Sequence, residues 1–327
     1  MPQAVIILDK QAFHQLPQPQ LAELVRGSGS KVCVFPINGT RRWFVLEHPE
    51  EAQANFVEAY LKISGQRHLD MYQLLFDHGI DTLLTPVIGP DVFERDAGYH
   101  PIIADGLRWF AEHPTYLAFY EAYDVRVRVY GDTERYLRGT RYESALDAFQ
   151  SLAQRTAHHQ TRRLFFGVCA NDSAETVARI GVQFQQQQGR LPNKREIVEA
   201  YYGEYIDPVS FFIGFDRLSV FDMPLIASGQ EDLYFTVSPS LYLTESGLRE
   251  ILYDHLYARR IREDYGQLTA QDFAMMAAFY RQNQSAVLGV GVQAASGNLW
   301  YPTFQLTLPE GMEAYLRSSS SATTPLE

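Results

Sequence analysis

The chain has 327 residues, of which 46% are hydrophobic and 20% are charged, and its formal net charge at pH 7 is −11. This composition predicts a globular protein with a large core. The acidic excess argues against nucleic-acid binding, which needs surplus Lys and Arg on the surface. We therefore expect any anionic ligand to be bound by a local cluster of arginines.

Both cysteines, Cys33 and Cys169, lie in apolar runs, which predicts buried reduced thiols and a cytoplasmic location. No apolar run approaches the ~20 residues that cross a bilayer, and no signal-peptide pattern is present, so we expect neither a membrane span nor a targeting segment. Residues 316–327 contain a stretch of low complexity at residues 318–327. We expect them to form a disordered tail, and the final Leu326 and Glu327 are typical of a cloning scar.

Short runs rich in β-branched and aromatic residues alternate with helical patterns along the chain. The runs are residues 31–37, 81–88, 125–131, 163–169, 209–215 and 232–237. Several are continuously apolar, as in strands that are buried on both faces of a parallel sheet. The pattern predicts an α/β fold with one domain over residues 1–315, in which helices flank a central six-stranded, mainly parallel sheet.

Ligands of such sheets bind beyond the carboxyl ends of the strands. The first run ends in a turn at residues 38–40 that is followed by Arg41 and Arg42. Guanidinium groups suit the paired oxygens of phosphate, so this turn predicts a phosphate or diphosphate site. The alternative is a solvated pair of arginines, and the flanking Trp43 and Phe44 argue against it because they indicate partial burial.

Other candidate groups carry weaker signals. Tyr201, Tyr202 and Tyr205 suit ordinary packing, with an aromatic pocket wall as the alternative. His158 and His159 have no companion at metal-ligand spacing, so we interpret them as a solvated helix end. Nucleotide P-loop, dinucleotide, zinc and nucleophile-elbow motifs are missing from the sequence. The residues alone therefore predict an α/β protein with a diphosphate pocket, without specifying a reaction.

Several segments resemble the cis-prenyltransferases, which have the undecaprenyl diphosphate synthase fold. The Asp-Gly-Asn-Gly-Arg-Trp turn of that family is similar to residues 38–43, and its Arg-Val-x-x-x-Gly-Asp strand is similar to residues 125–132. Its second-substrate motif, Arg-Thr-Ser/Gly-Gly-Glu, is replaced here by Phe-Phe-Ile-Gly-Phe-Asp at residues 211–216. The resemblance therefore implies ionisation of a single prenyl diphosphate rather than chain elongation.

Within that superfamily the chain resembles the branch of tuberculosinol and kolavelool synthases. The matching segments are residues 34–44, 119–132, 165–178, 199–225, 233–245 and 251–260. The resemblance implies a homodimer that takes a bicyclic diterpenyl diphosphate of the kolavenyl or tuberculosinyl type. It also implies that Mg²⁺ assists departure of the diphosphate and that water or a nucleoside quenches the allylic cation.

The same resemblance implies roles for particular residues. The diphosphate-binding residues are Gly39, Thr40, Arg41, Arg42 and Arg217, the catalytic residues are Asn38, Tyr60 and Tyr99, the metal-binding residues are Asn38 and Asp232, and Ser219 falls beside Arg217 in the same family motif. Asn38 stands where these enzymes have an essential Asp. An amide lacks the charge that attracts Mg²⁺ and is not a base. Either the enzyme works without that charge, or Asn38 replaces an aspartate to stall turnover.

The expected function is therefore that of a diterpene synthase that releases diphosphate and adds water, giving an alcohol such as kolavelool or tuberculosinol. One alternative is transfer of the diterpenyl group to adenosine. Another is a catalytically degenerate partner subunit of the same fold. The ring skeleton of the substrate and the stereochemistry of the product depend on the shape of a pocket that the sequence does not show.

Overall fold

The six predicted strands form one parallel sheet. In the computed structural model, which describes residues 8–94, 100–170, 173–260, 264–296, 299–303 and 306–319, these strands lie in the order β3-β4-β2-β1-β5-β6 and every neighbouring pair is parallel. Their bounds are β1 Val32–Val34, β2 Thr82–Ile88, β3 Val125–Tyr130, β4 Arg162–Val168, β5 Phe211–Phe215 and β6 Asp232–Thr236. The α/β class predicted from the sequence is confirmed.

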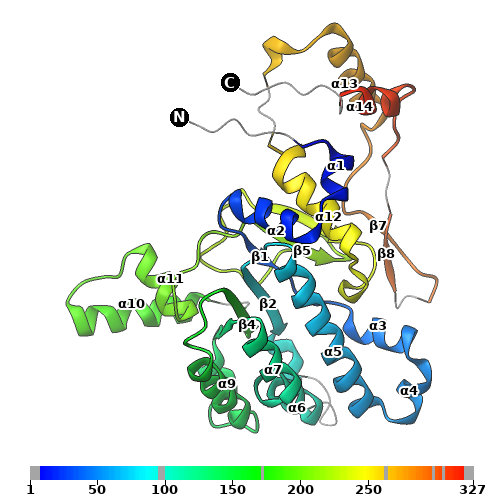
Figure 1. Cartoon of the computed structure of the whole chain (residues 1–327). Helices are drawn as coiled ribbons and strands as arrows, with labels where there is room; N and C mark the ends of the chain where they lie inside the picture. Colours follow the sequence, from blue (N-terminus) through cyan, green and yellow to red (C-terminus); the bar gives the residue numbers. More distant parts are fainter. Residues whose placement is uncertain are drawn as a thin grey trace.

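Helices connect most of the strands and cover the sheet (Figure 1). They are α1 Lys10–Gln15, α2 Gln18–Gly27, α3 Thr40–Glu47, α4 Pro49–Ala54, α5 Phe56–Asp77, α6 His100–Glu112, α7 Pro114–Ala122, α8 Thr133–Leu137, α9 Glu143–Arg155, α10 Ala174–Gln188, α11 Lys194–Tyr202, α12 Glu245–Tyr253, α13 Ala270–Gln282 and α14 Met312–Ser319. Local sequence explains several boundaries. For example, Asn193 and Glu196 form a reciprocal capping box at the start of α11.

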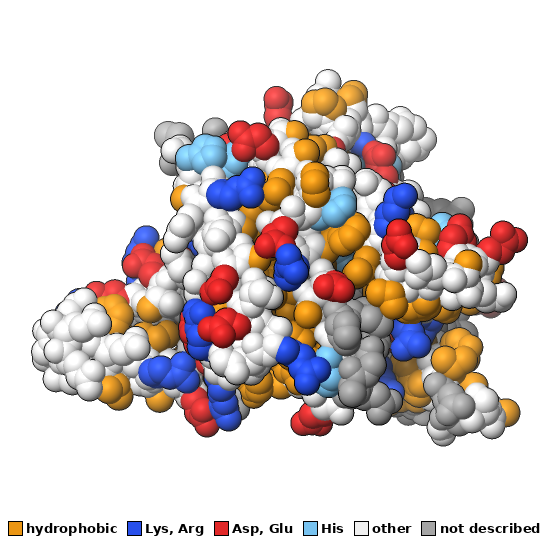
Figure 2. Space-filling model, turned by 90° about the horizontal axis from the view of Figure 1, so that it is seen from below, with side chains coloured by type: hydrophobic (Ala, Val, Ile, Leu, Met, Phe, Trp, Pro, Cys, Tyr) orange, Lys and Arg blue, Asp and Glu red, His pale blue; other side chains and the backbone are white. Residues whose placement is uncertain are grey.

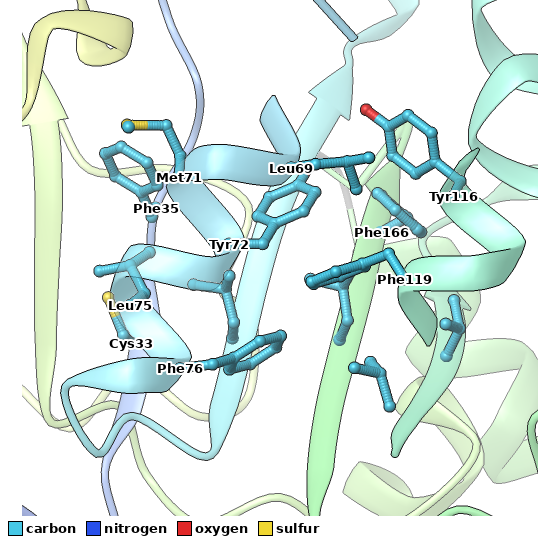
Figure 3. Close-up of a cluster of buried hydrophobic side chains, with 14 of the residues drawn as sticks. Cys33, Phe35, Leu69, Met71, Tyr72, Leu75, Phe76, Tyr116, Phe119 and Phe166 are labelled. Carbon is cyan, nitrogen blue, oxygen red and sulfur yellow. The ribbon is translucent and has the colours of Figure 1, made fainter. Parts of the chain in front are cut away.

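Alternate residues of each buried strand face two separate cores. In β1, Cys33 belongs to the core that contains α5, whereas Val32 and Val34 belong to the core that contains α11. Figure 3 shows the first core, where side chains of α5 face Phe119 of α7 and Phe166 of β4. Burial on both sides of the sheet therefore explains why these strands are apolar on both faces.

Helix α1 lies beside α12 although the two are far apart in sequence, and the rings of Phe13 and Tyr253 are 5.4 Å apart between centroids. The pair α10 and α11 projects to one side, and α13 and α14 lie beyond α12 (Figure 1). The segment after α12 also contains an antiparallel pair that the sequence did not predict, β7 Gly291–Gln293 and β8 Trp300–Pro302. On the face seen in Figure 2, acidic and basic side chains are interspersed.

Three sequence expectations concern the C-terminal tail, membrane spans and the cysteines. Helix α14 continues to Ser319, so the predicted tail boundary at residue 316 falls inside a helix, while residues 320–327 lie outside the described residues. Among the helices that the structure describes, none combines the length and the apolar character required to cross a bilayer. Both cysteines are buried, as predicted, and no disulfide joins them.

Candidate active site

The turn after β1 is fixed in place by the segment that follows β6. Asn38 donates its backbone N–H to the Ser240 hydroxyl at 3.1 Å, and Ser240 donates its own N–H to the Asn38 carbonyl at 3.0 Å. Gly39 caps α3 with a φ of 75°, and a Cβ there would lie 2.8 Å from the Phe215 ring. The left-handed backbone and the close approach both require glycine at this position.

This turn forms one end of a cavity of about 410 Å³. Six of the predicted site residues line it, namely Asn38, Gly39, Thr40, Arg41, Arg42 and Tyr60. The other walls come mainly from α5, β2, the short helix Pro90–Glu94 and α6, and they are mainly apolar, including Val92, Ile103, Leu107, Trp109 and Phe110. The volume falls within the usual range of about 300–1,000 Å³ for small-molecule pockets. The cavity therefore joins a cationic mouth to an apolar interior.

The two arginines are held by aromatic rings while their charged groups stay accessible. The Arg41 guanidinium lies over the Phe56 ring at 5.4 Å, and the Arg42 guanidinium lies over the Phe215 ring at 5.2 Å. Arg42 also approaches Asp216 at 3.7 Å. The next two residues, Trp43 and Phe44, are buried. The predicted partial burial is thus provided by the flanking residues, which leave the guanidinium groups at the cavity mouth.

Tyr60 is on α5, and both Tyr60 and Arg41 contact the ring of Phe56. The Tyr60 ring stacks on Phe56 with centroids 5.4 Å apart and meets the Phe44 ring edge-on at 5.5 Å. These contacts fix the ring plane beside the cavity. An aromatic face stabilises a nearby cation, and a phenol can donate to a departing oxygen.

The sequence predicted a role for Tyr60 but not for the other members of a polar stripe along α5. Tyr60, Ser64, His68 and Tyr72 recur every four residues and all line the cavity. Burial lowers the pKa of His68 to about 4 and raises the pKa of Tyr72 well above its usual value. The signal was visible as polar side chains at four-residue spacing on an otherwise apolar helix face.

Two other predicted residues are not brought into the cavity. Arg217 is exposed on the loop after β5, next to the Asp216 that approaches Arg42, and it does not line the cavity. Its neighbour Ser219 is exposed on the same loop. Tyr99 lies outside the described residues, so its role stays a prediction.

Asp232 lies near the amino ends of the parallel strands, away from the turn. It begins β6 and is level with Phe211 and Cys33, whereas Asn38 follows the carboxyl end of β1. Its carboxylate accepts hydrogen bonds from His255 at 2.6 Å and Arg260 at 2.7 Å. Burial lowers the pKa of His255, which favours a neutral ring whose N–H donates to Asp232. Within one chain the structure does not support the predicted metal site shared by Asn38 and Asp232.

We expect Asp232→Asn to destabilise the fold, because it weakens two hydrogen bonds of a buried carboxylate, one of them from a charged donor. The expected loss in the free energy of unfolding is about 1–3 kcal/mol, measured by urea denaturation. Asp81→Asn is the matched control, since its ion pair with Arg26 is exposed and contributes about 0–1 kcal/mol. A changed magnesium response in a stable Asp232→Asn protein would restore the metal role.

The residues around the cavity are a poor match for Mg²⁺. Asn38 supplies an amide oxygen, but no Asp or Glu occurs among the described residues that line the cavity. Magnesium in proteins is usually held by one or two carboxylates together with substrate phosphates. This donor set does not form a magnesium site of its own, so the arginines are the cavity's main counter-charge for a diphosphate.

The histidine pair of the sequence lies elsewhere. His159 is buried and hydrogen-bonded to Asp124 at 2.7 Å, so its interpretation as part of a solvated helix end is wrong. His158, His159 and Glu121 place potential ligand atoms within 4.8 Å of one another, but none of them lines the cavity. Tyr201 and Tyr202 pack in the second core.

Two known proteins are similar in sequence to most of this chain. The chain is 38% identical over 299 residues to a tuberculosinyl adenosine transferase of Mycobacterium tuberculosis (strain CDC 1551 / Oshkosh), covering 90% of this chain and 98% of that protein. It is 31% identical over 300 residues to a (+)-kolavelool synthase of Herpetosiphon aurantiacus, covering 88% of this chain and 96% of that protein. No family model matches the chain.

Among solved structures, a probable undecaprenyl diphosphate synthase from Campylobacter jejuni is similar, with a TM-score of 0.50 and 12% identity. The match covers 73% of this chain and 99% of that chain. At this identity the likeness shows the fold alone.

Proposed function

Because the chain belongs to the family of the tuberculosinyl adenosine transferase and the (+)-kolavelool synthase, with the cis-prenyltransferase fold, we propose that it removes diphosphate from a bicyclic diterpenyl diphosphate and adds water to the resulting cation. The resemblance inferred from the sequence motifs is thereby confirmed. The product would be a diterpene alcohol of the kolavelool or tuberculosinol type.

One observation carries this proposal. A single cavity joins Arg41 and Arg42 to walls of aromatic and aliphatic side chains. A diterpenyl diphosphate has the same division, with a compact anion at one end and a hydrocarbon group at the other. The arginines would bind the anion, and the apolar walls would take the hydrocarbon.

The proposed reaction begins when the carbon–oxygen bond to the diphosphate breaks. Arg41 and Arg42 stabilise the charge that develops on the leaving group, and charge-assisted hydrogen bonds to phosphate are the stronger kind. The Asn38 amide can orient the diphosphate without adding charge. Mg²⁺ bound to the diphosphate would supply further counter-charge.

The hydrocarbon end of the cavity then handles the allylic cation. Rings of Tyr60, Trp109 and Phe110 line this space, and ring faces attract a cation most strongly where water is excluded. The apolar walls also limit the number of water molecules that reach the cation. We infer that the cation lives long enough for the site to select its nucleophile.

The test of this proposal uses the purified protein with kolavenyl, tuberculosinyl and linear geranylgeranyl diphosphates, each with and without adenosine. We expect diphosphate release and an alcohol from a bicyclic substrate, identified by mass spectrometry. A product that contains the nucleoside would favour the transferase alternative. Absence of turnover on every substrate, including by Asn38→Asp, would favour the degenerate partner subunit.

We expect Arg41→Ala and Arg42→Ala each to weaken binding of inorganic diphosphate about 10- to 100-fold, because each removes charge-assisted hydrogen bonds of about 1.5–3 kcal/mol. Calorimetry measures the affinity. Arg195→Ala is the matched control, because its guanidinium also lies over a ring, that of Tyr205, and it does not line the cavity. Unchanged affinity in both cavity variants would remove the turn from the diphosphate site.

The homodimer and the cytoplasmic location belong to this proposal. Exposed apolar side chains are frequent after residue 286, including Val287, Leu288 and Tyr301, and such surfaces support self-association. Light scattering on the full chain would measure the oligomeric state. Two buried cysteines without a disulfide between them support a reducing compartment.

A further inference from the structure

Two buried polar atoms on α5 have no hydrogen-bond partner among the described residues. They are the hydroxyl of Ser64 and Nδ1 of His68, and both residues line the cavity. The Ser64 residue is only 3% exposed. Leaving a buried polar atom unpaired costs about 1–3 kcal/mol, so a hydrogen-bond partner that enters the cavity would stabilise both groups.

The contacts of Thr40 determine which nitrogen of His68 is free. The Thr40 hydroxyl has one hydrogen, which it donates to the Ile37 carbonyl at 3.0 Å. Its contact with His68 Nε2, at 3.4 Å, is therefore one in which the imidazole donates. The proton resides on Nε2, and the lone pair of Nδ1 is left as an acceptor on the helix that lines the cavity.

Ser64 and His68 are also close to both ends of the substrate site. They are one helical turn apart on α5, between Tyr60 and Tyr72. His68 contacts Thr40, which immediately precedes the two arginines of the diphosphate turn. A small molecule bound by Ser64 and His68 would therefore lie between the diphosphate end and the apolar end of the cavity.

We propose that Ser64 and His68 bind the water molecule that attacks the diterpenyl cation, and that His68 Nδ1 accepts the proton of that water. This inference rests on the proposed function. The Ser64 hydroxyl and the imidazole nitrogen act as the two protein partners of the water, which meets the usual need for two to four partners.

The addition needs no reactant other than the cation and water. The water oxygen forms a bond to the cationic carbon and becomes a protonated alcohol. Nδ1 then takes one proton, which leaves the neutral alcohol and an imidazolium. The imidazolium releases its proton to the diphosphate product or to solvent, and the neutral ring is restored.

The environment of His68 suits this role. Its ring stacks against Phe110 with centroids 5.9 Å apart, and burial lowers its pKa to about 4. The imidazole is therefore neutral at pH 7 and does not repel a neighbouring cation. Weak basicity is sufficient, because a protonated alcohol is a far stronger acid than an imidazolium.

The test measures how the cation is partitioned between products. A cation that meets no water loses a neighbouring proton and becomes a hydrocarbon. We expect His68→Leu to lower the ratio of alcohol to hydrocarbon at least about tenfold, and Ser64→Ala about threefold, corresponding to about 1.4 and 0.65 kcal/mol. His68→Gln, which keeps an acceptor, should restore part of the ratio. Diphosphate release is recorded in the same samples.

Thr176→Val is the matched control, because Thr176 also has a buried hydroxyl without a partner among the described residues but does not line the cavity. Its product ratio should equal that of the parent. If His68→Leu and Ser64→Ala release diphosphate with an unchanged ratio, this inference is wrong and the proposed function stands. If neither the parent nor Asn38→Asp releases diphosphate from any bicyclic substrate, both are wrong.

Discussion

Asn38→Asp is expected to raise the rate of alcohol formation at least about tenfold and to make it depend more strongly on Mg²⁺. The carboxylate adds a charged oxygen ligand at a cavity where the described lining residues include no acid. It also introduces a group that can accept a proton, an effect of about 10²–10⁴-fold where it operates. Single-turnover rates across a magnesium series measure both changes.

Asn193→Asp is the control for this substitution. Asn193 caps α11 outside the cavity, and Asp is an equally good capping residue. The control should therefore match the parent in rate and in metal response. Equal rates for Asn38→Asp and the parent would show that an amide is sufficient at this position, and that Arg41 and Arg42 carry most of the counter-charge.

Tyr60→Phe is expected to fold normally and to lose alcohol formation by about 10²-fold, within the range for removal of a proton donor or a positioned polar group. The ring is retained, so its stacking on Phe56 and its contact with Phe44 should persist. The loss would therefore report the hydroxyl alone. Tyr99→Phe is expected to have the same effect if the role implied by the family resemblance is correct.

Tyr280→Phe provides the comparison, because Tyr280 is 63% exposed and does not line the cavity. Thermal unfolding and product formation are measured on all three proteins. Full activity of Tyr60→Phe would reduce its role to packing beside Arg41. A loss of activity that follows a lower melting temperature would indicate a structural effect instead.

The substitutions also separate the steps of the proposed reaction. Changes at Arg41 or Arg42 should affect diphosphate affinity, whereas changes at Ser64 or His68 should affect the fate of the cation. Tyr60 lines the same cavity one helical turn before Ser64 on α5 and should affect turnover. A single measurement of total product would merge the three effects, so diphosphate, alcohol and hydrocarbon are followed separately.

Local sequence was sufficient to predict the strands of the sheet and the position of the arginine turn. Continuous apolar runs of β-branched and aromatic residues can be buried on both faces only in a covered sheet, so strands such as β2 and β4 were predicted to within a residue. The turn could be predicted in the same way, because Gly39, Arg41 and Arg42 all lie within residues 38–42 at the end of a strand.

Which distant residues come together depends on how the elements pack in the folded chain. Ser64 and His68 join the site because α5 packs beside the end of β1, a contact that no spacing within α5 reveals. Asp232 falls away from the site because strand pairing places it level with Cys33, near the amino ends of the strands. Local patterns fix which segments become strands and helices, whereas strand register and helix packing arise from long-range burial and place side chains together in space.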